Sequence, residues 1–128
     1  MAKTLVQADG VRLWTNGTGS AVVAGQMVKA TNMLGVALVD IANGATGSVD
    51  FTPGRIYSGI AKVSGAVFAV GEKLIWDVSA ASGAGAFDDS SATPATGDVT
   101  GAAIAVVAGE NGQTTCTIML TPGNTTVT

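Results

Sequence analysis

Apolar residues occur in short runs along the chain, and glycine or polar residues end each run before a helix of ordinary length can form. The runs are rich in valine and isoleucine, whose branched side chains suit the pleated surface of a sheet. This pattern predicts an all-β protein. We expect its strands at residues 5–7, 11–14, 26–30, 34–41, 48–52, 55–62, 73–77, 101–107 and 114–120.

Alternation along the last of these runs predicts which face is buried. Cys116, Ile118 and Leu120 alternate with residues that are mostly threonine, so we expect Cys116 to point into the core. The runs 34–41 and 102–107 are instead apolar on both faces. That pattern is typical of a strand covered on both sides by a barrel wall, a second sheet or a neighbouring subunit.

Turn residues agree with the apolar pattern. Asn-Gly pairs stand at 16–17, 43–44 and 111–112, each between two expected strands. Both residue types tolerate positive φ, which two-residue hairpin turns require. We therefore expect hairpins at these pairs.

The chain has 128 residues, the usual size of one domain. Residues 79–97 are nearly all small or polar with Phe87 as the one large side chain, and we expect a long flexible loop, packed under Phe87 or ordered on contact with a partner. We expect an N-terminal arm at 1–10 and a polar tail at 121–128, either frayed or reaching a neighbour. The expected fold is a small single-domain β-barrel or β-sandwich with short strands and extended termini.

Charged residues make up only 12% of the chain, against about 25% in typical domains. Either the chain tolerates a surface rich in threonine, serine and alanine, or part of that surface is covered by partners, its own copies included; we favour the second interpretation. The net charge is −3 and the six basic residues are scattered singly, so nucleic acid is not an expected partner. No apolar run is long enough to span a membrane, and the start has no apolar signal region.

Residues that carry catalysis are scarce. The sequence has no histidine, the commonest general base and metal ligand. Cys116 is the only cysteine, so an internal disulfide and a cysteine zinc site are both excluded, and we expect the chain to fold in a reducing cytosol. As a nucleophile Cys116 would need a nearby base, so burial in the core is the expected role.

Two motifs, one acidic and one rich in glycine, have some features of binding sites. Asp88-Asp89 is the only adjacent carboxylate pair, which predicts a solvated loop, with a weak Ca²⁺ contact as the alternative. The run 65–73 resembles a phosphate-binding loop, but Glu72 separates its last glycine from Lys73 and no hydroxyl residue follows the lysine. We therefore expect no catalytic, cofactor-binding or metal-binding residues, no small-molecule substrate, and a protein that is not an enzyme.

Several short motifs form a pattern that is specific when their order and spacing are taken together. They are Met1-Ala2-Lys3 with Gln7, Leu34-Gly35-Val36-Ala37, Asp40-Ile41-Ala42 with Gly44, Gly54-Arg55-Ile56-Tyr57, Gly65, Gly71-Glu72-Lys73-Leu74-Ile75-Trp76-Asp77, Gly101-Ala102-Ala103 and the closing run to Leu120. Over nearly the whole chain this pattern resembles the phage head decoration or cement proteins, also called domain of unknown function 2190.

The resemblance implies a compact β-barrel-like domain that binds the outer surface of a phage capsid and stabilises the shell by bridging major capsid subunits. It implies a homotrimer on the capsid, with the major capsid protein as partner, in a virion protein made in the host cytoplasm. It supplies no catalytic residues. Another virion part, such as a tail or fibre component, is the alternative, and a DNA-handling recombination factor is a more distant one.

The two ends of the chain are candidates for bridging contacts. Thr4–Gln7 and Thr125–Thr128 are uncharged and β-prone. Either segment has the character of a strand that adds to an exposed sheet edge of a neighbour.

Overall fold

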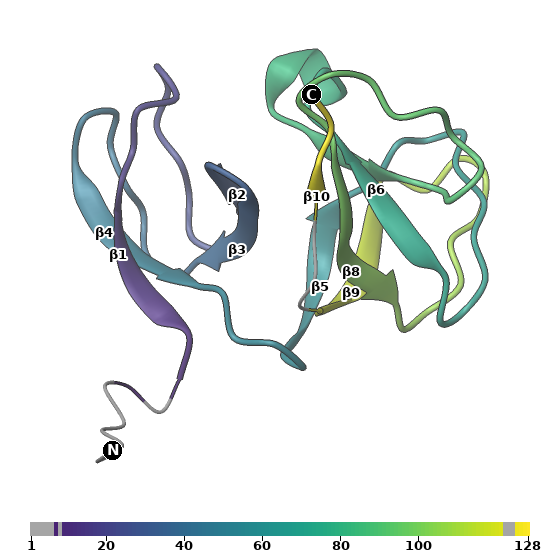
Figure 1. Ribbon diagram of the computed structural model, residues 1–128, viewed down its shortest axis with the longest axis horizontal. Helices are drawn as coiled ribbons and strands as arrows, with labels where there is room; N and C mark the ends of the chain where they lie inside the picture. The colour runs from purple at the N-terminus through teal and green to yellow at the C-terminus, as the bar shows by residue number, and fades with distance from the viewer. Residues whose placement is uncertain (1–6, 8, 122–124) are drawn as a thin grey trace.

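Figure 1 shows the computed structural model of the chain, which describes residues 7, 9–121 and 125–128. The described residues form two β-sheets and one short 3₁₀ turn at Ala81–Gly83. The strands are β1 (Val11–Thr15), β2 (Met27–Ala30), β3 (Met33–Ala37), β4 (Thr46–Asp50), β5 (Ile56–Ala61), β6 (Lys73–Asp77), β7 (Ala86–Asp88), β8 (Val99–Ala105), β9 (Thr115–Leu120) and β10 (Thr125–Thr126).

The all-β expectation is confirmed, with differences in detail. Eight of the nine expected strands have a counterpart, although β3 ends at Ala37, where a run to Ile41 was expected. Most of the expected strand at 5–7 lies outside the described residues. The strands β7 and β10 were not expected, because three and two residues are too few to show an alternating pattern.

The first sheet has the antiparallel order β1-β4-β3-β2 and lies on the left in Figure 1. One face of this sheet carries a small core of its own, which the connections before β2 and after β3 help to cover. Its buried residues are Val22, Val28, Ala37, Ile41 and Val49, with Trp14 and Phe51 packed against them.

The second sheet has the order β5-β9-β8-β6-β7, and β10 pairs with the same β8. A parallel bridge between Lys62 and Phe87 joins the end of β5 to β7, and the Val63 N–H donates to the Phe87 carbonyl at 2.9 Å. These contacts bring the two outer strands of the sheet together, so the second sheet curls into a small barrel. As the alternation predicts, Cys116, Ile118 and Leu120 are buried inside it.

The two sheets share one core. Met27, Leu34 and Val36 from the first sheet belong to the same buried cluster as the barrel interior. At its centre the rings of Trp76 and Phe87 meet edge to face, with centroids 4.9 Å apart. The covering expected on both faces of the strand at 34–41 is therefore confirmed for β3, which lies between the small core and the shared core.

Residues 79–97 are not a loop throughout, because β7 forms inside this segment. Phe87 is fully buried and is the side chain that holds the segment to the core. Gly85 comes so close to Trp76 that a Cβ there would lie 2.3 Å from the indole ring, so only glycine fits. The packing under Phe87 was expected, but the strand that carries it was not.

The described part of the C-terminal tail is bonded within its own chain. β10 pairs with the first residues of β8. The Val127 N–H donates to the Asp98 carbonyl at 2.8 Å, and the Val127 carbonyl accepts from the Gly97 N–H at 2.7 Å. Residues 125–127 are therefore part of the barrel. They are not available as a free strand for a neighbour.

Six strands are each preceded by the same kind of four-residue turn. In this turn the N–H of the fourth residue donates to the carbonyl of the first, and the third residue is a glycine with positive φ. This is the geometry of a type II turn. The turns are 23–26, 42–45, 52–55, 69–72, 95–98 and 110–113. In four of these turns the side chain of the fourth residue also accepts a hydrogen bond from the N–H of the first. These fourth residues are Gln26, Glu72, Asp98 and Gln113.

The expected Asn-Gly hairpins are wrong in type. The asparagines at 43 and 111 have negative φ and stand second in type II turns, so only the glycine needs positive φ. Asn16 is fully buried, and its side chain donates to the carbonyls of Ser20 and Ile41 at 2.7 and 2.9 Å. The role of Asn16 is therefore set by its tertiary hydrogen bonds and not by the glycine that follows it in the sequence.

Lys62 lies inside one end of the barrel and is 4% exposed. Its Nζ donates to the carbonyls of Val63, Glu110 and Gln113 at 2.9, 3.0 and 3.3 Å, and it lies 5.6 Å from the centre of the Phe68 ring. All three ammonium protons thus have an acceptor. Lys62 holds the connection between β8 and β9 against the end of β5.

Asp50 ties the two sheets together at the connection from β4 to β5. It is fully buried; Oδ1 accepts from the Thr52 N–H at 2.9 Å, and Oδ2 accepts from the Tyr57 hydroxyl and, at 3.2 Å, from the Arg55 guanidinium. Burial would raise the pKa of Asp50, but hydrogen bonds from Thr52 and Tyr57 and the charge of Arg55 outweigh it and hold the pKa below its usual 3.8. Burial and the bond to Asp50 raise the pKa of Tyr57 to about 12.

The first prediction concerns Lys62. Lys62→Met keeps most of the aliphatic side chain but leaves three carbonyls without the buried ammonium that donates to them, so the free energy of unfolding should fall by about 2–4 kcal/mol. Urea unfolding measures it. Lys73→Met, at an exposed position, should change the same quantity by less than about 0.5 kcal/mol. Equal unfolding midpoints for the two variants would contradict the role of Lys62.

The second prediction concerns Asp50 and pH. Because its folded pKa lies below 3.8, the carboxylate stabilises the fold above that pH, and this contribution is lost as the pH falls through the folded pKa. The unfolding free energy of the wild type should therefore drop between about pH 4 and pH 2. Asp50→Asn should be less stable at pH 7 and should lose less over that interval. Parallel pH profiles for the two proteins would show that Asp50 makes no such contribution.

Candidate docking surfaces

The residues that sequence reasoning weighed for chemistry have structural roles. Cys116 is buried, and this burial raises the pKa of its thiol to about 11, so the nucleophilic thiolate is disfavoured. Asp89 accepts from the N–H and hydroxyl of Ser91, and Asp88 accepts from the Asp89 N–H. No group of three or more potential metal ligands occurs among the residues that the structure describes.

Glu72, which interrupts the phosphate-loop pattern, closes a turn. One of its carboxylate oxygens accepts from the Ala69 N–H, and the other accepts from the N–H and hydroxyl of Ser90. Hydrogen bonds from the Ser90 and Ala69 N–H groups hold the pKa of Glu72 below its usual 4.5. The carboxylate therefore joins the turn before β6 to the segment after β7.

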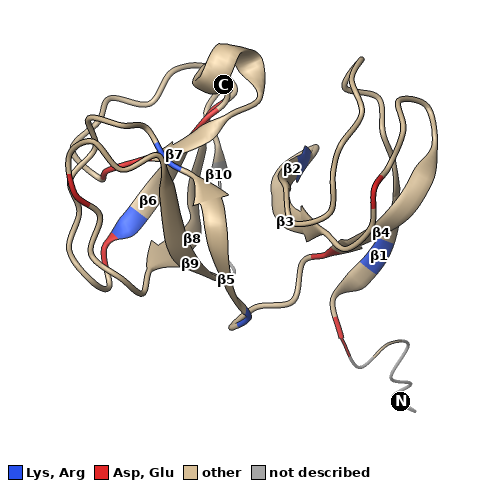
Figure 2. Ribbon diagram, turned by 180° about the vertical axis from the view of Figure 1, so that it is seen from behind, with Lys and Arg blue, Asp and Glu red and all other residues tan. Residues whose placement is uncertain are grey.

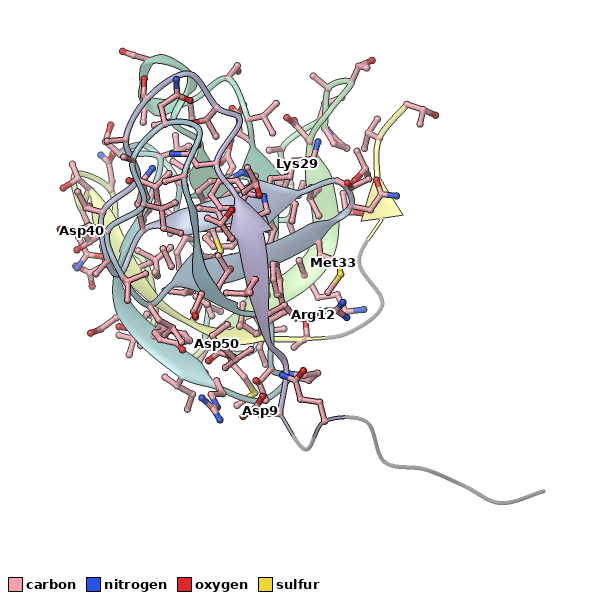
Figure 3. The ribbon with its side chains drawn as sticks, turned by 90° about the vertical axis from the view of Figure 1, so that its left-hand side faces the viewer. Asp9, Arg12, Lys29, Met33, Asp40 and Asp50 are labelled. Atoms are coloured by element: carbon pink, nitrogen blue, oxygen red, sulfur yellow. The ribbon has the colours of Figure 1, made fainter. Side chains whose placement is uncertain are left out.

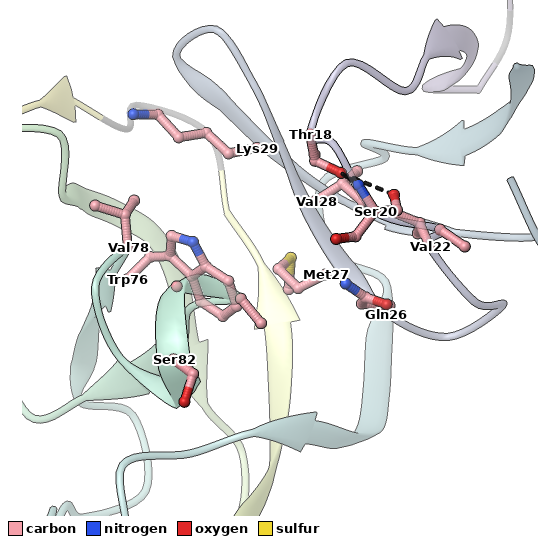
Figure 4. Close-up of a pocket in the computed structure, with 13 residues that line it drawn as sticks. Thr18, Ser20, Val22, Gln26, Met27, Val28, Lys29, Trp76, Val78 and Ser82 are labelled. Atoms are coloured by element: carbon pink, nitrogen blue, oxygen red, sulfur yellow. Dashed lines mark hydrogen bonds between the residues drawn. The ribbon is translucent and has the colours of Figure 1, made fainter. Parts of the chain in front are cut away.

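A pocket of about 370 Å³ lies where β2 of the first sheet approaches the end of β6 (Figure 4). Met27 and Trp76 line it from the two sheets, with small residues of the segment 82–84. Lys29 is its one charged lining residue, and the Lys29 Nζ already donates to the Gly97 carbonyl at 2.6 Å. The other polar side chains of the lining are Thr18, Ser20, Gln26 and Ser82, so the pocket is a mixed polar and apolar seam between the sheets.

The outward face of the barrel carries an apolar row that crosses three strands. The register aligns Ile56 of β5 with Met119 of β9 and Met119 with Ile104 of β8, and Val106 follows on the same face. Ile56 is 56% exposed and the others are partly exposed. We call these four residues the wall strip. Lys73 continues the row on β6, and Arg55 precedes Ile56.

The wall strip accounts for the apolar character of the run 102–107 on both faces. Ala103 and Ala105 point into the shared core, whereas Ile104 and Val106 point away from it. In β3 the second apolar face is covered by the chain itself. In β8 the outward-facing Ile104 and Val106 are only partly buried by the described residues, so the expectation of a neighbouring subunit stays open for this strand.

The outer strand of the first sheet provides a second exposed surface. β1 pairs only with β4, and Leu13 at its centre is 76% exposed. Figure 3 shows this side of the molecule, with Arg12 on β1 and Asp9 just before the strand. Of the expected N-terminal arm at 1–10, residues 1–6 and 8 lie outside the described part.

Charged side chains do not gather on either surface. In Figure 2 the basic and acidic residues are scattered over both sheets, as the sequence indicated. Within the described residues the structure records one ion pair, between Arg55 and Asp50. Within the same residues no helix is both long and apolar enough to cross a membrane.

The family model for phage cement proteins matches residues 6–120 of this chain. The chain belongs to the phage cement protein family. Membership supports a structural, capsid-associated role and a place in the virion, and the resemblance inferred from the sequence is thereby confirmed. No curated protein and no solved structure matches the chain.

For a cement protein the surfaces that matter are those that contact other proteins, and the sequence analysis did not name the wall strip. One signal was present, because Met119 is the only apolar residue on the threonine face of β9. Ile56 and Ile104 could not be joined to it from sequence. Their alignment depends on the register between strands that are far apart in the chain.

Proposed function

We propose that this cement protein binds the outer surface of a phage capsid and stabilises the shell by bridging major capsid subunits. The observation that carries the proposal is the wall strip, a partly exposed apolar row on a barrel whose interior is already filled. Burial of apolar side chains on a sheet face against a partner is favourable, because it removes them from water. Family membership supports association with a phage capsid.

Bridging needs two surfaces held in a fixed relation. The wall strip belongs to the second sheet and the exposed edge of β1 to the first. The shared core and the buried Asp50 cluster join the sheets, so a load on one surface passes to the other. Each contact can be weak, because many copies act on one shell.

The proposed arrangement on the capsid is a homotrimer, with the major capsid protein as the partner beneath it. A three-fold ring joins two different patches of each copy. The protein has no catalytic step in this account, and it reaches the virion from the host cytoplasm, where it is made.

The third prediction tests the wall strip on matured shells that lack the protein. Ile56→Glu places a charge in the row, so shell occupancy at a fixed protein concentration should fall at least tenfold, while the unfolding midpoint changes little because Ile56 is largely exposed. Occupancy is measured after sedimentation of the shells.

Two controls accompany this variant. Thr96→Glu adds the same charge at an exposed turn on another part of the barrel and should keep wild-type occupancy, as should the conservative Ile56→Val. Wild-type occupancy by Ile56→Glu would rule out the wall strip as the shell contact. Failure of the wild type to bind any shell would contradict the proposed function, and electron microscopy of the virion would then show whether the protein lies in the tail or fibre.

The fourth prediction separates the two ends of the chain. Deleting residues 1–6 should lower shell occupancy and leave the unfolding midpoint unchanged, if the arm adds to a neighbour. Deleting residues 125–128 should lower the midpoint itself, because these residues pair with β8. Unchanged occupancy after the first deletion would remove the arm from the proposal.

A further inference from the structure

The outer edge of β1 presents backbone groups that belong to no sheet. The hydrogen bonds at Gly10 and Asn16, on either side of β1, both point toward β4. Backbone groups alternate in direction along an antiparallel strand, so the N–H and carbonyl groups of Val11, Leu13 and Thr15 point away from β4.

The chain protects one end of this edge and leaves the centre open. The Val11 N–H donates to Asp9 at 3.1 Å, and the side-chain amide of Gln7 donates to the Val11 carbonyl. Among the described residues none covers the outward N–H and carbonyl of Leu13. The Leu13 side chain is also the most exposed large apolar side chain of this part of the chain, at 76%. An unprotected edge with an exposed apolar residue is a site for strand addition.

The sequence of β1 is complementary to itself when reversed about Leu13. In an antiparallel pair of two copies centred there, Leu13 faces Leu13 of the other copy, and Arg12 faces Trp14. Arg12 is exposed and forms no ion pair with the residues described, and Trp14 is half-buried on the same face. A guanidinium beside an indole is an attractive cation–π contact, and a two-fold interface repeats it twice.

We propose that a second copy of this chain adds to β1 in antiparallel fashion, on a two-fold axis at Leu13, and joins the two four-stranded sheets into one. This inference rests on the proposed function, because so short a contact buries less than the roughly 1,000 Å² of a stable interface. Copies docked on a shell are held at high local concentration, where a weak contact forms. Being two-fold, the contact joins neighbouring docked units and does not complete a three-fold ring.

Disulfide trapping tests the axis and its register. In the proposed pair the Cα atoms of the two Leu13 residues are about 5.5 Å apart, within the range that a disulfide spans. Leu13→Cys should form a covalent dimer under mild oxidation with diamide, on decorated shells and at high concentration in solution. Non-reducing electrophoresis after denaturation measures the dimer.

Matched variants report the register. Thr15→Cys lies on the same edge but away from the axis, and it should yield at least fivefold less dimer. Val11→Cys combined with Thr15→Cys should restore the dimer, because these positions face each other across the axis. The wild type, whose Cys116 is buried, should give none.

Two outcomes overturn the inference. One is equal dimer from Leu13→Cys and Thr15→Cys, and the other is no dimer from Leu13→Cys on shells that it occupies fully; in the second case a strand of the capsid protein is the better occupant of the edge. Shell occupancy by reduced Leu13→Cys is measured alongside. If that protein and the wild type both fail to bind shells, the proposed function fails, and dimer formation in solution still decides the β1 contact.

Discussion

The structure depends on β3 being covered on both faces. One face closes the small core of the first sheet, and Leu34 and Val36 on the other face enter the core of the barrel. Without this shared packing the first sheet would be a four-stranded layer with one apolar face in water, at a cost of about 25 cal/mol for each Å² of that face. The two sheets are therefore one mechanical unit, as the proposed bridging of capsid subunits requires.

Two buried charged groups lie at the joints of this unit. Asp50 lies where the chain crosses from the first sheet to the second, and Lys62 lies where the barrel closes. Each is buried, and each satisfies its hydrogen-bonding groups within the chain. The chain has few charged residues, and the remaining ones are too sparse to cover its surface. Apolar rows such as the wall strip are therefore left for partners.

The sequence analysis predicted the features that depend on neighbours along the chain. Alternation predicted that Cys116 is buried, valine-rich runs predicted eight strands, and packing under Phe87 was one of two interpretations of the segment 79–97. It did not predict β7, whose strand character comes from pairing with β6, or the shape of the turns, where the backbone of Asn43 stays at negative φ. The wall strip could not be predicted for the same reason, since Ile56, Ile104 and Met119 become neighbours only through strand register.

The central claim is that this cement protein meets the shell through the wall strip. An electron cryo-microscopy map of decorated shells, fitted with the two sheets as one body, tests it directly. If the wall strip is the shell contact, Ile56, Ile104 and Met119 lie against density of the major capsid protein. A map in which this row faces solvent, with the shell contacted by another surface, would rule the wall strip out.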